Sequence, residues 1–403
     1  MNRTPLMSER RTAMLGGALV AIGPISMALY TPAMPVLAAA FDTSQAMIKL
    51  TLTAYFTGFA LSQLLCGPLT DAFGRKPIAL LFLSLYLAST LLATYAPTIE
   101  WMLAARALQG VGASVGIAVS RALARDQFVG QASARIMNTT GMMLAIGPAL
   151  APTIGGVTLE LFGWREIFIA MIIYGVALML GVMVFMRETN PYIDRSNLHP
   201  YRLFRNYLTL ITDTRFLQPS LLTGIGTGTI YTMATILPFV LIDKVGLTPV
   251  EFGFGMMVQS CSFIAGTIVT ARLLRRVEAH RLLPYGIAGI VVAAVSMVVL
   301  LTMFPLHFLT VMGPVGLFVF FLATVMPSAF TSALHDFPKI AGAASAMMGF
   351  LQFGAGLAGS LVAAALGDPL LGVVIVPPGM MLLAVGLYQV LGMRNRRRAI
   401  AAE

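Results

Sequence analysis

The chain has 403 residues, of which 58% are hydrophobic and only 10% are charged, and its mean hydropathy is +0.86. A soluble domain carries about 25% charged residues, so this composition excludes a pair of soluble domains and indicates that the main solvent is lipid. The formal net charge of +10 is explained by orientation in the membrane and attraction to anionic membrane lipid, and it requires no nucleic-acid partner.

Apolar runs of about 20 residues, the length of a helix that crosses a 30 Å hydrocarbon core, follow one another along the whole chain. The first six lie near residues 14–37, 46–69, 78–96, 101–123, 136–159 and 165–186. The last six lie near residues 219–241, 250–272, 282–304, 307–333, 341–366 and 370–392. Because the runs are uninterrupted rather than alternating, they predict an all-α membrane protein with twelve transmembrane helices.

A polar, arginine-rich stretch between the sixth and seventh runs divides the chain almost in half. It predicts an N-terminal six-helix bundle at 1–187, a cytoplasmic linker at 188–218 and a C-terminal six-helix bundle at 219–403. With both termini cytoplasmic, only three of the 26 basic residues fall outside, namely Lys49, Arg165 and Lys244. This asymmetry follows the positive-inside rule and supports the count of twelve spans.

The second run ends in the sequence Gly67-Pro-Leu-Thr-Asp71-Ala-Phe-Gly74-Arg75-Lys76. Asp71 and Arg75 have the spacing of an ion pair on a helix, and the two glycines permit a tight reversal. Such a charged cluster at a helix seam can act as a latch that holds one conformation. A plain positive-inside turn is the alternative, and it would explain the two basic residues but not the acid.

This decapeptide resembles the signature of the major facilitator superfamily, G-x-L-x-D-x-x-G-R-[RK]. The resemblance implies two six-helix bundles that rock around a central substrate site. In that family the loop packs near the inner end of the fourth span, where Arg125 and Asp126 lie here. The resemblance therefore implies a cytoplasmic gate network that includes Asp71, Arg75, Arg125 and Asp126.

The fourth run contains Arg106, Gln109 and Gly110, which match a second family motif, R-x-x-Q-G. Gln109, Gly112, Gly116 and Ser120 recur at three- and four-residue steps, so Arg106 shares a small, polar face that packs against helices or lines a cavity. Because Arg106 lies near the start of the run, its side chain could instead snorkel to the headgroups.

The fifth run carries Gly147, Pro148, Pro152 and the pair Gly155 and Gly156. Two prolines four residues apart predict a kinked helix, and the glycines predict a close approach to a neighbour. The run resembles a third family motif that is found chiefly in antiporters, with Ala151 in place of one glycine. The resemblance implies export, with this helix sealing the exit pathway.

Two further stretches, Leu29–Pro35 and 337–354, are similar to the Bcr/CflA (bicyclomycin-resistance) subfamily of twelve-span drug:proton antiporters. That subfamily usually has an aspartate two residues before the tyrosine of the first stretch, where this chain has Ala28. The acids and histidines all fall in loops or at span ends, so no buried proton carrier is visible. Coupling through Asp71 and Asp126, facilitation without protons, and a tyrosine or water relay near Arg106 all stay open.

The expected function is multidrug efflux from the bacterial inner membrane by a monomer, with protons as the coupling ion and neither a metal nor another cofactor. Without a cavity carboxylate, the site should favour neutral or anionic amphipathic compounds. Candidate cavity residues, for each of which helix packing is an equal explanation, are Tyr30, Arg106, Gln109, Asn138, Met142, Tyr231, Gln259 and Gln352. A metabolite facilitator or importer is the alternative, whereas no HExxH or GxSxG motif suggests an enzyme.

Overall fold

The computed structural model describes residues 5–128, 130–190, 193, 199–337 and 340–400, and within these ranges all regular secondary structure is helical. Among these described residues, twelve helices are long and apolar enough to cross a membrane. The expected fold class is therefore confirmed. The predicted linker residue Arg195, and Pro338 and Lys339 in the second subfamily-like stretch, lie outside the described residues.

In the described part of the first half there are six spanning segments, of which the first is divided into three helical pieces. Their bounds are α1 (Glu9–Tyr30) with η1 (Thr31–Ala33) and α2 (Met34–Ala40), α3 (Gln45–Phe73), α4 (Arg75–Thr94), α5 (Ile99–Gln127), α6 (Gly130–Leu161) and α7 (Trp164–Phe185). The helix α5 lies at the centre of this half and packs against α1, α3 and α4. A large apolar core fills the space between them.

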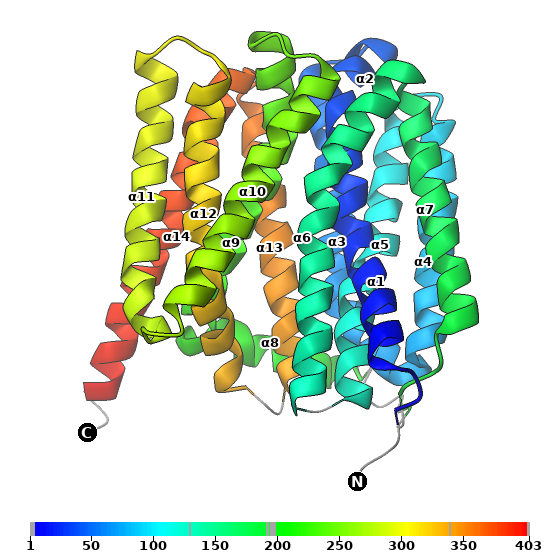
Figure 1. Cartoon of the computed structure of the whole chain (residues 1–403), viewed down its shortest axis with the longest axis vertical. Coiled ribbons are helices and arrows are strands. Elements are labelled where there is room, and N and C mark those ends of the chain that lie inside the picture. The colour runs from blue at the N-terminus through cyan, green and yellow to red at the C-terminus, as the bar shows by residue number, and fades with distance from the viewer. Residues whose placement is uncertain (1–4, 129, 191–192, 194–198, 338–339, 401–403) are drawn as a thin grey trace.

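The second half repeats this plan with six more spanning segments. Their bounds are α9 (Thr214–Pro238) with the π-helix η3 (Phe239–Lys244), α10 (Pro249–Leu273), α11 (Ala279–Met303), α12 (Phe308–His335), α13 (Ala341–Ala365) and α14 (Pro369–Ile400). Here α9 packs against α12, α13 and α14 around a second apolar core. The two halves meet where α3 packs on α13 and where α6 packs on α10, and Figure 1 shows the second pair in front.

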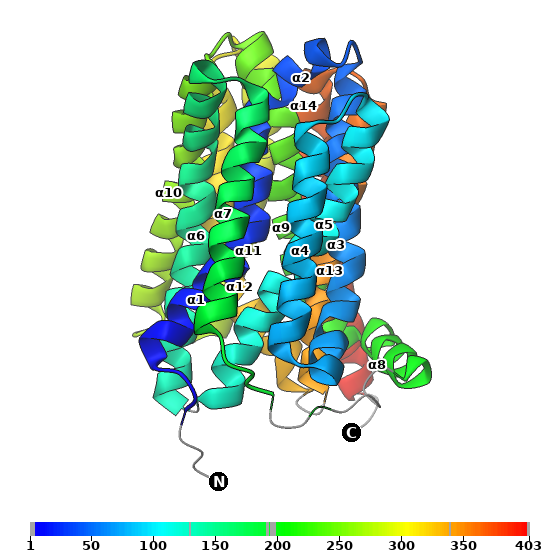
Figure 2. The same cartoon turned by 90° about the vertical axis from the view of Figure 1, so that its right-hand side faces the viewer.

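The helix α1 begins and α14 ends at the same end of the molecule, which also carries α8 (Pro200–Thr212) (Figures 1 and 2). We call this the inner end, after the distribution of basic residues, and the opposite one the outer end. The helix α8 lies across the spans, where the Tyr207 hydroxyl donates a 2.6 Å hydrogen bond to the carbonyl of Leu64 in α3. The linker helix therefore contacts the first half as well as leading into the second.

The seventh spanning helix begins at Thr214, before the apolar run that starts near residue 219. The Asp213 carboxylate accepts a 2.9 Å hydrogen bond from the backbone amide of Arg215, which caps the helix. An acidic N-cap satisfies an otherwise free amide and favours the helix dipole. Arg215 therefore lies in the first turn of the seventh spanning helix.

Candidate functional site

Arg106 is fully buried in the core of the first half. Its Nη1 donates to the side-chain oxygen of Gln109, one turn along α5. The guanidinium carbon lies 4.3 Å from the ring centroid of Tyr30 in α1 and 4.6 Å from that of Tyr55 in α3. The snorkelling alternative is therefore wrong, because the side chain stays between the helices instead of extending to the headgroups.

Two of the guanidinium nitrogens, Nε and Nη2, are buried without a hydrogen-bond partner, and no carboxylate among the described residues pairs with Arg106. A buried charge without a counter-ion costs several kcal/mol, and a desolvated cation–π contact returns only about 2 kcal/mol. The site therefore presents two guanidinium nitrogens without partners, with three N–H groups between them, to any acceptor that enters. An anionic group or a carbonyl oxygen would satisfy them.

The polar groups around Arg106 are held in place by their own hydrogen bonds. The hydroxyl of Tyr30 lies 2.6 Å from that of Thr51, and the Tyr55 hydroxyl donates to the carbonyl of Gly23 at 2.9 Å. Gln109 donates to the Thr90 hydroxyl at 2.8 Å. Each of these three side chains therefore has a hydrogen-bond partner of its own. The bonds orient the tyrosine rings over the guanidinium and do not neutralise its charge.

The small face predicted along α5 packs against helices and does not line a cavity. A Cβ at Gly110 would meet the carbonyl of Tyr55, and one at Gly116 would meet the carbonyl of Leu19. A Cβ at Gly112 would meet the backbone of Tyr86 in α4. These close backbone approaches bring α1, α3 and α4 around Arg106.

Between Arg106 and the second half lies a stack of aromatic rings. Phe59 of α3 stacks on Phe353 of α13, with 3.9 Å between ring centroids, and Phe353 stacks on Tyr231 of α9 at 4.6 Å. Phe56 stacks on Tyr231 at 5.5 Å, and Tyr55 contacts Phe59 at 6.1 Å. We call Phe56, Phe59, Tyr231 and Phe353 the aromatic seam, because they join the two halves directly beside the Arg106 site.

The predicted cavity residues divide into three groups. Tyr30 and Gln109 contact Arg106, whereas Tyr231 belongs to the aromatic seam and Gln352 lies half-buried beside Phe353. The other three are elsewhere. Asn138 and Met142 are exposed on α6, and the half-buried Gln259 of α10 has a side-chain oxygen without a partner. The structure therefore does not bring all eight residues to one site.

At the inner end, Arg75 is the centre of an ion-pair network. Its Nε lies 3.0 Å from the Asp126 carboxylate at the end of α5, and its Nη1 contacts Asp71 and donates to Thr70 at 2.8 Å. The predicted pair of Asp71 and Arg75 is present. Arg125 has a minor place, since it is 62% exposed and approaches Asp126 only to 3.8 Å.

Sequence reasoning missed Glu188 in this network. Its carboxylate accepts 3.0 Å hydrogen bonds from the backbone amides of Arg75 and Lys76 and so caps α4. Gly74, at φ +98°, brings the chain so close that an added Cβ would lie 2.7 Å from this carboxylate. The available signal was an acid directly after the sixth run, at the end where α4 begins.

All of these groups belong to the first half, since they come from α3, α4, α5 and the segment after α7. The network therefore fixes the inner end of one bundle, and its role as a gate stays a prediction. A different side chain joins the halves at this end. Arg121 of α5, which the sequence analysis did not single out, donates to the hydroxyl of Ser345 in α13.

At the outer end, α6 packs between α1 and α10 through its predicted glycine pair. A Cβ at Gly155 would meet the carbonyl of Leu29, and one at Gly156 would meet the carbonyl of Pro249 in α10. Pro148 and Pro152 lie within the same helix, where they remove two backbone donors. The position fits a helix that closes the outer end, and the sealing role stays a prediction.

Two side-chain contacts tie the halves together nearby. Gln45 donates to Asp243 at 2.9 Å, and the backbone amide of Val250 donates to Glu160 at 3.2 Å. Lys49, expected in an outer segment, instead lies buried in the first turns of α3. Its Nζ has no hydrogen-bond partner and lies 5.5 Å from the ring of Phe239 in η3.

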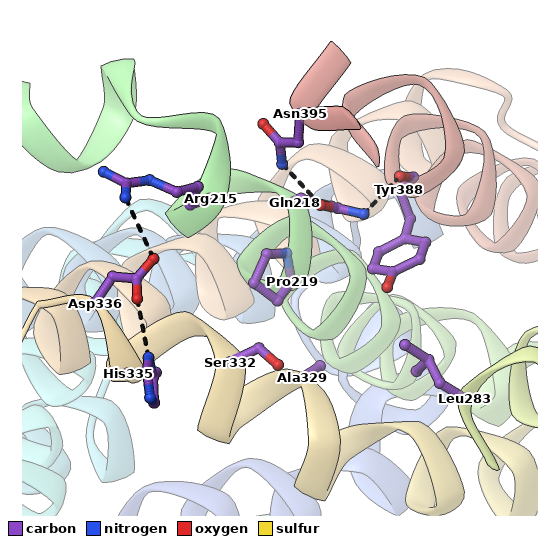
Figure 3. A pocket seen from close by; sticks show the side chains of 10 residues that line it. All are labelled: Arg215, Gln218, Pro219, Leu283, Ala329, Ser332, His335, Asp336, Tyr388 and Asn395. Atoms are coloured by element: carbon purple, nitrogen blue, oxygen red, sulfur yellow. Dashed lines mark hydrogen bonds and ion pairs between the residues drawn. The ribbon is translucent and has the colours of Figure 1, made fainter. Parts of the chain in front are cut away.

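A polar cavity of about 320 Å³ lies at the inner end of the second half (Figure 3). Arg215 approaches Asp336 at 3.6 Å, and Asp336 lies 2.9 Å from His335. On the other side of the cavity, Asn395 donates to Gln218 at 2.9 Å. In the described part of the chain, no group of three or more His, Cys, Asp or Glu side chains could hold a metal ion.

Comparison with known proteins places this architecture in a family. A model of the Major Facilitator Superfamily matches residues 16–363. An uncharacterized MFS-type transporter of Bacillus subtilis (strain 168), YdgK, is 30% identical, with 93% of this chain and 91% of that protein covered. The resemblance stated from the sequence is confirmed at this level.

Other relatives have names that refer to resistance. A bicyclomycin resistance protein homolog of Haemophilus influenzae is 28% identical over 86% of this chain and 87% of that protein. Multidrug resistance protein D of Escherichia coli is also 28% identical, over 86% of each chain. Among solved structures, a bacterial homolog of the human lysosomal transporter Spinster, in an inward-facing and occupied conformation, superposes with a TM-score of 0.72. It is 13% identical, covering 94% of this chain and 96% of that one, so it supports the fold alone.

Proposed function

Because the chain belongs to the major facilitator superfamily and is a twelve-span membrane transporter of small molecules, we propose that it exports antibiotic-like compounds from the cytoplasm. The proposed substrates are neutral or anionic amphipathic molecules, and the proposed unit is a monomer in the bacterial inner membrane. The observation that carries the proposal is Arg106, a fully buried cation with two guanidinium nitrogens that have no hydrogen-bond partner. The resistance names of two relatives support the direction and the substrate class.

The charge at Arg106 provides the selectivity. Two like charges about 5 Å apart at an effective dielectric constant of 20 repel by about 3 kcal/mol, so a cationic compound would be disfavoured more than a hundredfold. An anionic or carbonyl group would instead accept from Nε and Nη2. Because the rings of Tyr30 and Tyr55 cover the guanidinium, binding requires at least one ring to move. The aromatic seam beside them would move with the rocking of the two halves.

We place the coupling of export to protons at Asp71 and Asp126. Both carboxylates pair with Arg75, so their protonation would remove the negative charge that holds this arginine. The inner end of the first half would then loosen. Among the described spans, no acidic side chain pairs with Arg106, so the coupling group and the selectivity group are separate in this proposal.

A facilitator without proton coupling is the second candidate, and one observation favours it. Ala28 lies buried in α1, at the position where the resembling subfamily has its acid. A chain without that acid could move its substrate down a gradient alone. Import of a metabolite would be possible by the same route.

Transport by everted membrane vesicles, with and without an imposed pH gradient, tests the proposal. We expect the gradient to accelerate the vesicle uptake that corresponds to export, and Asp126→Asn to abolish the acceleration. Asp42→Asn is the matched control, because Asp42 is outside the network and its φ of +45° suits asparagine. A gradient that has no effect on the native chain but drives Ala28→Asp would establish the facilitator. Substrate accumulation in intact cells would contradict export.

A further inference from the structure

A groove of about 650 Å³ runs along the surface of the first half, between α1 and α7. The two helices lie side by side and run in opposite directions, so the start of α1 faces the end of α7 (Figure 2). Met14 and Ala18 line one wall, and Tyr174 and Phe185 line the other. Neither helix packs against the second half along this face, so the groove opens toward the lipid.

The length of the groove fits one leaflet of a bilayer. Tyr174 and Phe185 are about 16 Å apart along the helix, at 1.5 Å per residue, and a leaflet has about 15 Å of hydrocarbon. At the deep end, the Tyr174 hydroxyl donates to the carbonyl of Ala18 at 2.7 Å. This bond satisfies the Tyr174 hydroxyl, and the groove walls between Tyr174 and the inner end are apolar. The groove can therefore hold an acyl chain without burying a free polar group.

The inner mouth of the groove carries two cations, Arg10 and Arg11. The guanidinium carbon of Arg11 lies 5.3 Å from the ring centroid of Phe185, and its Nε is buried without a hydrogen-bond partner. Within the described residues neither arginine forms an ion pair, because the neighbouring Glu9 pairs with Arg135 at 2.9 Å. Unpaired cationic donors at headgroup depth, at the mouth of an apolar groove, complement the negative charge of a phosphate.

The corresponding part of the second half borders the polar cavity of about 320 Å³ described above. There α9 and α14 take the places of α1 and α7, and polar side chains bridge them (Figure 3). Asn395 donates to Gln218 at 2.9 Å, and Gln218 donates to the carbonyl of Tyr388 at 3.2 Å. The six-helix plan thus permits a bridged seam, so the open groove is a property of the sequence of α1 and α7.

We propose that this groove binds one anionic phospholipid of the inner leaflet. Its phosphate contacts Arg10 and Arg11, and one acyl chain lies between α1 and α7 as far as Tyr174. The lipid fills the space between α1 and α7, whereas side-chain hydrogen bonds bridge α9 and α14 at the equivalent place in the second half. It therefore stabilises the packing of α1 against α7, whichever compound the transporter carries.

Native mass spectrometry of the full chain tests the proposal, with phosphatidylglycerol and phosphatidylcholine titrated separately. One tightly bound phosphatidylglycerol is expected, with about a 30-fold preference over phosphatidylcholine, from about 1 kcal/mol for each arginine. Arg10→Gln combined with Arg11→Gln should abolish the preference. The matched control is Arg275→Gln with Arg276→Gln, two exposed inner-end arginines outside the groove, and it should retain the preference.

A second variant fills the groove without touching the charges. A Cβ at Gly181 would meet only Leu15, at 3.7 Å, so Gly181→Phe has room in the groove and should exclude the acyl chain. Gly386→Phe is the control, because Gly386 of α14 is exposed with nothing within 4 Å. Equal binding of the two lipids to the native chain would overturn the proposal. It would also be overturned if both the arginine pair variant and Gly181→Phe kept the phosphatidylglycerol, or if a transported compound displaced it from the groove.

Discussion

Two buried arginines in this chain should respond in opposite ways to the same substitution. Arg75 is 4% exposed and pairs with Asp71 and Asp126, whereas Arg106 is fully buried and has no carboxylate partner among the residues that the structure describes. Removal of one partner from a buried ion pair costs about 3 to 5 kcal/mol, because the other charge is left uncompensated. Arg75→Met should therefore destabilise the first half by about 3 kcal/mol, the lower figure, since Asp71 is 39% exposed.

For Arg106→Met the balance is different. The substitution removes a desolvated charge, and replacing buried charges by apolar groups often stabilises by about 1 to 4 kcal/mol. It also leaves the side-chain oxygen of Gln109 without its donor, which costs about 1 to 3 kcal/mol. The two effects nearly cancel, so the net change should lie between zero and a stabilisation of about 1 kcal/mol.

Thermal unfolding of the purified protein in one detergent, followed by tryptophan fluorescence or by aggregation, measures both effects. With about 2 to 4 °C per kcal/mol for a unit of this size, Arg75→Met should lower the unfolding temperature by roughly 6 to 12 °C. Arg106→Met should leave it unchanged or raise it by a few degrees. If Arg106→Met lowered it as much as Arg75→Met, Arg106 would have a counter-ion and our reasoning would be refuted.

Three further predictions concern the two ends of the molecule. Gly74→Ala should destabilise the protein by at least about 1 kcal/mol, because the φ of Gly74 is +98° and the added Cβ would meet the Glu188 carboxylate that caps α4. In the same unfolding assay the control Gly67→Ala should be neutral, because a Cβ there has nothing within 4 Å. Gly156→Leu should push α6 away from α10, so that a membrane-impermeant thiol reagent labels a cysteine introduced at the outer end. Gly141→Leu, in open space on the same helix, should not increase this labelling. Equal labelling of the two variants would count against an α6 seal. Lys49→Met should reduce that labelling below the native level, because it removes a buried ammonium without a hydrogen-bond partner from the closed outer end. Increased labelling would show that Lys49 helps to hold the halves together.

The sequence was sufficient for the spans and for the residues whose role depends on local spacing. Asp71 and Arg75 lie four residues apart, so their pairing could be predicted from the helix period alone. The face that Arg106 shares with Gln109 and several glycines favoured a place inside the bundle, but it left snorkelling open until the structure showed the side chain buried. Positive charge was equally informative, since the basic residues gather at one end.

Contacts between distant segments could not be predicted in this way. Glu188 caps α4 although it lies 113 residues after Arg75 in the chain, and Arg121 of the first half donates to Ser345 of the second. Neither contact has a periodic signal, because each depends on how whole helices pack. Lys49 was placed at the outer side by the order of the spans, which does not show that its side chain is buried against neighbouring helices. Asn138 was included for its polarity within a span, and polarity does not say which face of α6 it lies on.

The central claim is that Arg106 selects the substrate, and ligand binding to the purified transporter tests it most directly. Two fluorescent amphipathic compounds of similar shape, one a carboxylate and one a quaternary ammonium, would be titrated against the native chain and Arg106→Met. A charge-assisted hydrogen bond contributes about 1.5 to 3 kcal/mol, so the variant should lose roughly 10- to 150-fold in affinity for the carboxylate. It should bind the ammonium more tightly than the native chain does, because the repulsion from Arg106 is removed. Tight binding of the quaternary ammonium to both proteins, with unchanged affinity for the carboxylate, would contradict the account.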